Sequence, residues 1–520
     1  MFKKNWLIAL AILLGLGNCS KDSSSKSRLI VAQKLSSIIT LDPADVFETE
    51  CMDFIFNTYQ RLFKTIGGAV QNDLVESYEF VEGGKILRLT IKKDQYFSSG
   101  NVVTAEDVVY SLRRLVLMQK AAYIMFAPLG FTPQSVRQHI REVDPHTVEL
   151  EFQNPLSKDL VLTCLAASAS SILDAALVKE HTVNDDYGAA WLRSAGAGSG
   201  PLMLGVWQPG EVLTMKRNPY YEDSDDIKFT TVILRHVGDV ATQMLLLKRG
   251  EVDIIRDLPQ EQSESVDKEK YDLEYISKAQ IWYLNLNQSN KYLKNPAVHQ
   301  AIRHLIDYSV MSKVLGEKVA QPLPTLVPSG FLGHITNPEL PEFNPEKARE
   351  IIHAEYGGDI EIEFDTSMLA LAQVYQSIFA KGGIKLKLNY FDARQAISRL
   401  RKRQHQMSLK MFGADYNDPH TFITTFVLLP QNESQAVTFV AWRNSLDVEG
   451  LQEMAHKAST IMDTTERTKI YEEIQRRYQK VPLIPLAEIY ATILFSKRLS
   501  GPRIFIKEAL IYHHLYKKDV

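Results

Sequence analysis

The residues of this 520-residue chain that could do chemistry do not combine into a reactive site with a known spacing. The three cysteines, Cys19, Cys51 and Cys164, are far apart, and no Cys-x-x-Cys or His-Glu-x-x-His pattern of metal ligands occurs. No nucleophile elbow is present, so a secreted hydrolase is a weakly supported alternative. The glycine-rich segment 196–201 lacks the Lys-Ser/Thr of a phosphate-binding loop, and we interpret it as a turn before a strand at Leu202. We therefore expect no catalysis, no cofactor and no metal site.

Size and charge narrow the class of protein further. A chain of this length exceeds what one hydrophobic core usually serves, so two or more lobes are expected. Its 59 Lys and Arg are offset by 62 Asp and Glu, which leaves a formal net charge of -3. Nucleic acid is an unsuitable partner, because binding its phosphates requires a concentrated basic surface.

Two strands can be predicted from residues that alternate between apolar and polar. Between residues 86 and 92, Leu87, Leu89 and Ile91 alternate with polar side chains, as expected of a strand with one buried face. The same alternation recurs in residues 148–152. The turn 98–100 closes the first strand.

Two helices have recognisable start signals. Thr104 precedes Ala105-Glu106-Asp107, where its hydroxyl can cap the first turn, and the buried face would contain Val108, Leu112, Leu115 and Val116. A second helix should follow Asp463, with Ile470, Ile474 and Tyr478 at every fourth position. Strands and helices in mixed order indicate an α/β or α+β protein, and these helices have structural roles.

The N-terminus has the layout of an export signal. Lys3 and Lys4 precede an apolar run over residues 6–16, about half the roughly 20 residues that would cross a bilayer core. Residues 1–18 therefore read as a signal peptide. Cys19 follows Leu16-Gly17-Asn18 in a string that resembles a lipobox, although Asn18 departs from the usual small residue, and the polar segment up to residue 27 suits a flexible tether. We expect an exported protein anchored to the membrane through lipid on Cys19; the alternative is conventional cleavage.

The two remaining cysteines could pair in an oxidising compartment or stay buried as small apolar residues. The sequences around Cys51 and Cys164 differ in character. Free cysteine is often interior, so we favour two free, buried thiols.

Several short blocks occur in the order found in one known family. The most specific contains Phe97-Ser98-Ser99-Gly100 and Thr104-Ala105-Glu106-Asp107-Val108-Val109-Tyr110-Ser111-Leu112. The others are Leu41-Asp42-Pro43, Tyr59-Gln60-Arg61-Leu62-Phe63, Gly198-Ser199-Gly200-Pro201, Arg217-Asn218-Pro219-Tyr220-Tyr221, Gly250-Glu251-Val252-Asp253-Ile254, Asn285-Leu286-Asn287, Val298-His299-Gln300-Ala301-Ile302 and Ala414-Asp415-Tyr416-Asn417-Asp418-Pro419. Nearly end to end, the chain resembles the family 5 extracellular solute-binding proteins of ABC transporters, in the oligopeptide-binding lipoprotein subgroup.

The resemblance implies an α/β, two-lobed fold like that of type II periplasmic binding proteins with an inserted extra domain. Mixed β-sheets flanked by helices would enclose a ligand cleft between the lobes. The domains would be lobe I (28–59, 197–281 and 484–520), an inserted small domain (60–196) and lobe II (282–483).

The resemblance also implies a function and a site. The protein would capture short oligopeptides in an extended conformation and deliver them to the permease subunits of an ABC importer, as a monomer. Asp415, in the Ala-Asp-Tyr block, would bind the peptide amino terminus, and Phe47, Glu48 and Thr49 would pair with the peptide backbone as a strand. Four aromatic residues would wall the pocket: Trp282, Tyr283, Phe412 and Tyr416.

Alternatives to this site and ligand stay open. Asp415 could instead cap the turn before Asn417-Asp418-Pro419. Phe412 stands where the family has Trp, and Lys410 is one place out of register with a basic residue that some members use for the peptide carboxylate. A relative that binds another ligand is also conceivable: glutathione or a cell-wall peptide, a metal complex, haem or a sugar. A soft metal would favour clustered His or Met, and we interpret His513-His514 as solvated surface.

Overall fold

A single eleven-stranded sheet passes through the protein. The computed structural model describes residues 27–429 and 439–518, so the predicted signal peptide and Cys19 lie outside the described residues. The strand order is β15-β14-β16-β12-β17-β11-β1-β10-β9-β8, with β13 added beside β17. The strands are β1 (Arg28–Gln33), β8 (Leu202–Gln208), β9 (Val212–Arg217), β10 (Thr231–His236), β11 (Ile254–Arg256), β12 (Tyr271–Leu286), β13 (Ala320–Pro322), β14 (Ile360–Thr366), β15 (Ile384–Tyr390), β16 (Met407–Gly413) and β17 (Leu483–Ser496).

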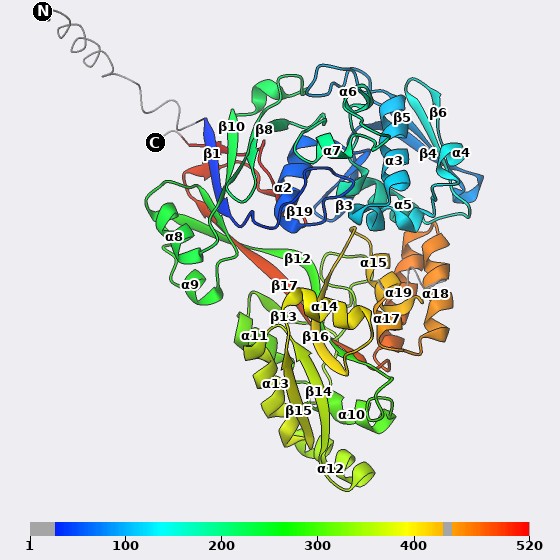
Figure 1. The fold of residues 1–520 in the computed structure, drawn as a ribbon, viewed down its shortest axis with the longest axis vertical. Coiled ribbons are helices and arrows are strands. Elements are labelled where there is room, and N and C mark those ends of the chain that lie inside the picture. The colour runs from blue at the N-terminus through cyan, green and yellow to red at the C-terminus, as the bar shows by residue number, and fades with distance from the viewer. Residues whose placement is uncertain (1–26, 430–438, 519–520) are drawn as a thin grey trace, which may run out of the picture.

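Lobe I is built on one end of this sheet and lies at the upper left of Figure 1. β1 pairs in parallel with β10 and β11, while β8, β9 and β10 are antiparallel. Around them lie α2 (Thr49–Thr58), α8 (Val240–Lys248), α9 (Gln260–Glu264), the pair β18 (Leu499–Ser500) and β21 (Tyr516–Lys517), and the hairpin of β19 (Ile504–Ile506) and β20 (Ala509–Ile511). Its core includes Leu29, Phe54, Leu213 and Ile493.

Lobe II occupies the lower part of the molecule (Figure 1). β14 pairs in parallel with β15 and β16, and β16 is antiparallel to β12. Its helices are α10 (Pro296–His304), α11 (Ser309–Leu315), α12 (Pro345–Tyr356), α13 (Leu369–Lys381), α14 (Ala393–Arg401), α15 (His420–Val427), α17 (Val440–Arg443), α18 (Glu449–Thr460) and α19 (Thr464–Tyr478). Apolar side chains form separate cores on the two faces of the sheet, one with Ile302 and Phe364, the other with Phe422 and Ile474.

The small domain is inserted between α2 and β8 and carries its own sheet, in the order β4-β5-β7-β6. Its elements are β2 (Phe63–Ile66), β3 (Ala69–Asn72), β4 (Val75–Val81), β5 (Ile86–Ile91), α3 (Ala105–Met118), α4 (Val136–His139), β6 (Ile140–Asp144), β7 (Thr147–Glu151), α5 (Lys158–Ala166), α6 (Ala175–Glu180) and α7 (Ala189–Leu192). Both predicted strands are confirmed as β5 and β7, and the predicted apolar face of α3 is buried.

The predicted helix starts are also confirmed. Thr104 and Asp107 form a reciprocal capping box at the start of α3, and the Asp463 carboxylate accepts the N–H of Glu466 at the start of α19. The segment 196–201 leads into β8 at Leu202, as expected.

The two lobes are joined by long antiparallel strands that belong to both. β12 and β17 pair from Tyr271↔Ser496 to Asn285↔Leu483, with register shifts after Ser277 and after Trp282. The predicted boundary between residues 281 and 282 falls inside β12, so each lobe contains part of the same ladder (Figure 1). Among the residues that the structure describes, no helix is both long and apolar enough to cross a membrane.

Candidate ligand-binding cleft

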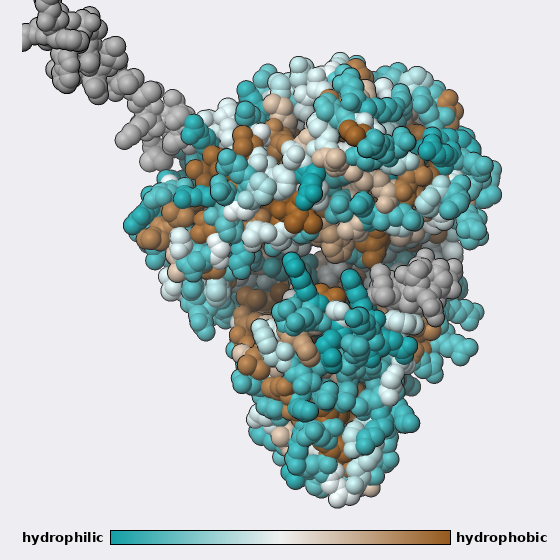
Figure 2. Space-filling model, in the orientation of Figure 1, coloured by the Kyte–Doolittle hydropathy of each residue, from teal (hydrophilic) through white to brown (hydrophobic). Residues whose placement is uncertain are grey.

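A cavity of about 440 Å³ lies between the two lobes, and Figure 2 shows a recess on this face that separates the upper from the lower part of the molecule. Lobe I, the small domain, β12 and lobe II all contribute to its lining. The lining includes Phe47, Thr49, Met52 and Phe56 near the start of lobe I, Gly67 and Gly68 in the β2–β3 turn, Met125 and residues 166–168 of the small domain, 276–280 in β12, 329–331, Met411 and 413–417 in lobe II, and 505–509 around the β19–β20 turn. A molecule held there would contact lobe I, the small domain and lobe II at once.

Asp415 lies in this cavity, two residues beyond the end of β16. Pairing of Gly413 with Gln280 carries this end of β16 to the middle of β12, between the lobes. Asp415 is 8% exposed as a whole residue, and its backbone N–H donates to Thr421 Oγ1 at 3.1 Å. Burial raises the pKa of Asp415 to about 6, although the nearby charge of Lys507 and a Thr421 hydrogen bond act in the opposite direction. A buried carboxylate of this kind gains most from a cationic partner that enters with the ligand.

Asp418, and not Asp415, caps the turn that follows. Its Oδ1 accepts the backbone N–H of His420 at 2.8 Å. Both of its oxygens also accept from Arg467, at 2.6 and 2.8 Å, and the two side chains are buried. Since Asp418 and Arg467 hold the turn, the Asp415 carboxylate is available for another role.

Lys507 is a cleft residue that the sequence analysis missed. It stands in the turn between β19 and β20, with φ +53°, and reaches from lobe I to lobe II. Its ammonium donates to the backbone oxygen of Asp415 at 2.9 Å and to that of Ala414. Burial lowers the pKa of Lys507 to about 8. The available signal was the spacing of two short apolar runs, 504–506 and 509–511, which two residues separate as in a tight hairpin, although Lys-Glu is not a usual turn pair.

Beside Lys507, a second pair of opposite charges lines the cavity. Lys278 of β12 lies 3.0 Å from the Asp257 carboxylate and 3.5 Å from that of Glu508. Burial raises the pKa of Glu508, while Lys278 opposes this shift. Lys278 is therefore shared between two carboxylates, those of Asp257 and Glu508.

The predicted backbone-pairing segment reaches the cavity only in part. Phe47 and Thr49 line it, whereas Glu48 does not. Glu48 is extended, with φ -73° and ψ 130°, and α2 begins at Thr49. Only the residues before Thr49 can pair with a ligand as a strand. From Thr49 on, the backbone N–H and C=O groups point along the helix axis and not sideways toward a ligand strand.

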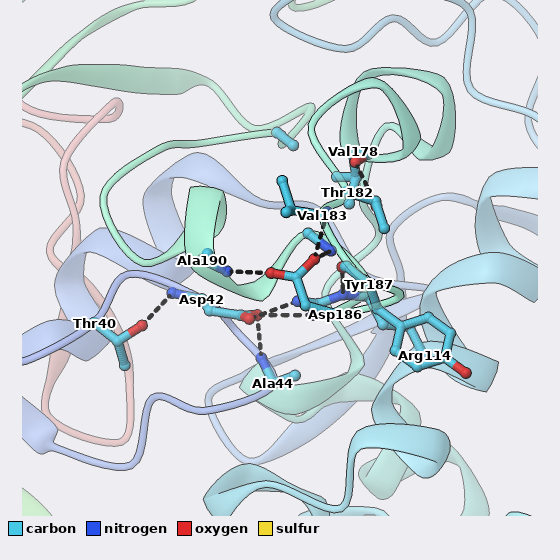
Figure 3. Close-up of polar contacts among 12 residues, drawn as sticks. Thr40, Asp42, Ala44, Arg114, Val178, Thr182, Val183, Asp186, Tyr187 and Ala190 are labelled. Atoms are coloured by element: carbon cyan, nitrogen blue, oxygen red, sulfur yellow. Dashed lines mark hydrogen bonds and ion pairs between the residues drawn. The ribbon is translucent and has the colours of Figure 1, made fainter.

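A buried ion pair holds the chain that leads to Phe47. Both oxygens of Asp42 accept from Arg114 of α3, at 2.8 and 2.6 Å, and Arg114 Nε donates to the Tyr187 carbonyl (Figure 3). Asp42 Oδ1 also accepts the N–H of Ala44 at 3.0 Å. The small domain thus fixes the position at which this segment of lobe I enters the cleft.

Of the four predicted aromatic residues, only Tyr416 lines the cavity. Tyr283 and Phe412 pack edge-on against Phe426, with ring centroids 4.9 and 5.6 Å apart, and Trp282 packs on the other core of lobe II. On β16, successive side chains face opposite sides, so Met411 reaches the cavity while Phe412 turns into the core. Lys410 is half-buried and does not line the cavity.

Cys51 and Cys164 are both free and buried, which confirms the prediction of two unpaired thiols. The interpretation of His513-His514 as solvated surface is wrong for His513. That side chain is partly buried, with its ring centroid 6.1 Å from that of Tyr221, and burial lowers its pKa to about 3. Within residues 27–429 and 439–518, no group of three or more His, Cys, Asp or Glu side chains could hold a metal ion.

Two lobes joined by shared strands, with a cavity between them lined by both charged and apolar side chains, have the architecture of a two-lobed solute-binding protein. The chain belongs to the family described as bacterial extracellular solute-binding proteins, family 5, whose middle-region model matches residues 69–434. Proteins of this family bind substrates for ABC transporters and are not enzymes.

Individual relatives agree with this assignment over nearly the whole chain. The probable D,D-dipeptide-binding periplasmic protein DdpA of Escherichia coli K12 is 26% identical over 479 residues, which are 90% of this chain and 89% of the relative. The glutathione-binding protein GsiB of the same strain is 24% identical over 511 residues, or 95% and 94% of the two chains. The structure of the ABC transporter-associated periplasmic binding protein DppA from Helicobacter pylori, in complex with peptide STSA, matches with a TM-score of 0.77 at 22% identity, covering 95% of this chain and 99% of that one. This last likeness confirms the predicted two-lobed α/β fold.

Proposed function

We propose that this protein captures short peptides with a free amino terminus between its two lobes and delivers them to the permease of an ABC importer. The observation that carries the proposal is the buried Asp415 carboxylate in the cavity, whose pKa is raised to about 6 by burial. A peptide ammonium would donate directly to this carboxylate, which otherwise has only the more distant charge of Lys507 nearby, and a charge-assisted hydrogen bond of this kind contributes roughly 1.5–3 kcal/mol. The names of DdpA and GsiB, which bind a dipeptide and glutathione, support this class of ligand.

We assign the other predicted site residues either to contact with the ligand or to packing behind the cavity wall. Phe47 and Glu48 would offer backbone groups to an extended ligand, while Thr49 and Tyr416 would contact it from the cavity wall. Trp282, Tyr283 and Phe412 would act from behind that wall by packing, not by contact with the ligand.

The proposal is tested by calorimetry with di- to penta-alanine and the same peptides acetylated at the amino terminus. We expect the free peptides to bind and acetylation to weaken binding at least about tenfold, because the ammonium charge is lost. Asp415→Asn should weaken the free peptides by a similar factor, and Asp418→Asn is unsuitable as a control because it would disturb the turn. Equal binding of free and acetylated peptides would remove Asp415 from the site.

Glutathione is a second candidate ligand, favoured by the similarity to GsiB over nearly the full chain. It carries a free amino group, so the same carboxylate could receive it. Titrations of the protein with glutathione and with the alanine peptides show which of these two kinds of ligand binds more tightly.

Anchoring is proposed from the sequence, since Cys19 lies outside the described residues. After export and removal of residues 1–18, lipid on Cys19 would hold the protein at the membrane, with residues up to 27 as a tether and the folded body as a monomer. Cys19→Ser should move the protein from the membrane fraction to the soluble fraction, and light scattering should give the mass of one chain. Membrane retention of Cys19→Ser would contradict the anchor.

A further inference from the structure

We propose that the inserted small domain has a task of its own: it clamps lobe II in the closed protein, through Tyr416 at the cavity and through the first turn of α5 outside it. This inference goes beyond the proposed function, because the clamp would serve any solute around which the lobes close. The evidence is a set of contacts between the small domain and lobe II that continues from the cavity to the outer surface.

Tyr416 belongs to lobe II but packs in the core of the small domain. It follows β16, yet its side chain joins the buried cluster that contains Phe63, Leu115 and Cys164. Tyr416 is 3% exposed, and among the described residues its hydroxyl has no hydrogen-bond partner, so apolar packing holds the ring. When the two domains separate, this side chain has to leave the core, which exposes apolar surface to water.

Outside the cavity, two helix ends meet across the same interface. The N–H of Ser157, the N-cap of α5, donates to the carbonyl of Ser459 in the last turn of α18 at 2.8 Å. Groups at helix ends have no partner in their own helix, so each satisfies the other here. Met462, which follows α18, packs so closely that a Cβ on Gly84 of the small domain would lie 3.0 Å from its sulfur.

Asp159, in the first turn of α5, extends this contact to α19. Its Oδ2 accepts from Thr464 Oγ1 at 2.9 Å and lies 3.8 Å from a guanidinium nitrogen of Arg467. Arg467 also donates two hydrogen bonds to Asp418, which caps the turn that follows Asp415. The outer contact is therefore linked through one arginine to the segment that carries the Asp415 carboxylate.

The clamp and the shared strands hold the lobes together at different places. In Figure 1 the contact of α5 with α18 and α19 lies to the right of the crossing of β12 and β17. Because the small domain is inserted in lobe I, opening of the cleft separates lobe II from both, and the clamp contacts favour the closed state. Weakening them should lower the affinity for every solute by one factor, chiefly through faster release.

Charge reversal at Asp159 tests the outer contact. Asp159→Lys removes the acceptor of Thr464 and places a second cation beside Arg467. Because like charges repel, we expect calorimetry of the mature protein to give an affinity for tri-alanine about tenfold or more below that of the wild type. The ratio between the affinities for free and acetylated tri-alanine should stay unchanged, since Asp159 does not line the cavity. Stopped-flow measurements should show faster release.

Glu106→Lys is the matched control. Glu106 has the same position in the first turn of α3 that Asp159 has in α5, and it pairs with Lys179 inside the small domain at 2.6 Å. The two substitutions therefore change the charge of a first turn in the same way, but only Asp159→Lys disturbs a contact with lobe II. The control should keep the wild-type affinity to within about twofold.

A disulfide across the clamp gives the complementary test. The 2.8 Å hydrogen bond keeps the Cα atoms of Ser157 and Ser459 within about 6.7 Å of each other, a distance that a disulfide can span. In mature protein with Cys19→Ser, Ser157→Cys and Ser459→Cys, oxidation should slow the release of bound tri-alanine at least about tenfold, and dithiothreitol should restore it. Each single cysteine variant should release tri-alanine at the wild-type rate.

The outcomes distinguish failure of the clamp from failure of the proposed function. If Asp159→Lys and Glu106→Lys weaken binding equally, or if the oxidised protein releases tri-alanine as fast as the reduced protein, the clamp is overturned while peptide binding stands. The disulfide test decides the matter if Asp159→Lys fails to fold.

A wild-type protein that binds no alanine peptide would overturn the proposed function but would not decide on the clamp. Small-angle X-ray scattering then decides: Asp159→Lys should have a larger radius of gyration than Glu106→Lys, and equal radii would overturn the clamp.

Discussion

Arg114 and Asp42 form a bidentate ion pair with N–O distances of 2.8 and 2.6 Å, and the two side chains are 1% and 2% exposed. The pair joins α3 of the small domain to the segment of lobe I that leads to Phe47 (Figure 3). The pair therefore connects two of the sequence blocks noted above. Asp42 belongs to the block Leu41-Asp42-Pro43, and Arg114 lies just after the block from Thr104 to Leu112.

Replacing Arg114 by Met should destabilise the protein strongly. The change leaves the Asp42 carboxylate buried without its partner, which costs about 3–5 kcal/mol. Urea denaturation followed by circular dichroism measures the loss. Arg88→Met removes an arginine whose side chain is 45% exposed, and it should lower the midpoint much less. If the two variants lowered the urea midpoint equally, the buried Arg114–Asp42 pair would contribute no more to stability than an exposed pair does.

Asp415→Asn should make the unliganded protein more stable at neutral pH. The folded-state pKa of Asp415 is raised from 3.8 to about 6, so the folded protein favours the protonated acid, and stability falls as pH rises between these values. Above pH 6 the ionised carboxylate destabilises the fold by up to about 3 kcal/mol, which the amide avoids. Thermal unfolding should show a higher Tm for the variant at pH 7.5. The difference should vanish near pH 4, and an unchanged Tm at pH 7.5 would contradict the raised pKa.

Peptide affinity should fall as the pH drops below about 6. Protonation of Asp415 removes the charge that attracts the ligand ammonium, so each further pH unit should weaken binding by up to about tenfold. Lys507, with a pKa of about 8, stays protonated over this range. Titrations at pH 7.5, 6 and 5 measure the trend.

The control for this pH profile is Glu508→Gln, because burial also raises the pKa of Glu508. This variant should keep the dependence, whereas residual binding by Asp415→Asn should be nearly independent of pH. A wild-type affinity that is constant between pH 7.5 and 5 would refute the assignment of Asp415 to the ligand ammonium.

Cys51 and Cys164 should resist thiol reagents until the protein unfolds. Both are buried, and burial raises the pKa of each thiol well above its usual value, which suppresses the reactive thiolate. With Cys19 replaced by Ser, Ellman's reagent should detect almost no thiol in the native protein and both thiols in denaturant. A missing thiol in denaturant would mean that the two residues had formed a disulfide.

Local patterns identified the elements of this fold, but they could not show which side of a strand meets the ligand. The alternation at Leu87, Leu89 and Ile91, and the caps at Thr104 and Asp463, depend on neighbours in sequence, and the structure confirms them. The orientation of Trp282, Tyr283 and Phe412 depends on how β12 and β16 pair and on which face of the sheet each core covers.

The two charged cleft residues, Asp415 and Lys507, also differ in how far the sequence alone could reveal them. Asp415 was found because it belongs to a recognisable block at the end of a strand. Lys507 is more than 90 residues further along the chain, and only the folding of the β19–β20 hairpin between the lobes brings it to Asp415. Contacts of such long separation leave no local pattern to read.

The shared ladder of β12 and β17 also means that neither lobe can be expressed separately without breaking paired strands. A lobe expressed alone would have strands without their partners, and such unpaired strand edges promote aggregation. For the same reason the halves cannot slide past each other, so the opening that admits a solute has to be a bend or twist of the shared strands. Its natural weak point is the register shift after Ser277, because at the shift after Trp282 the strands β16 and β13 flank β12 and β17.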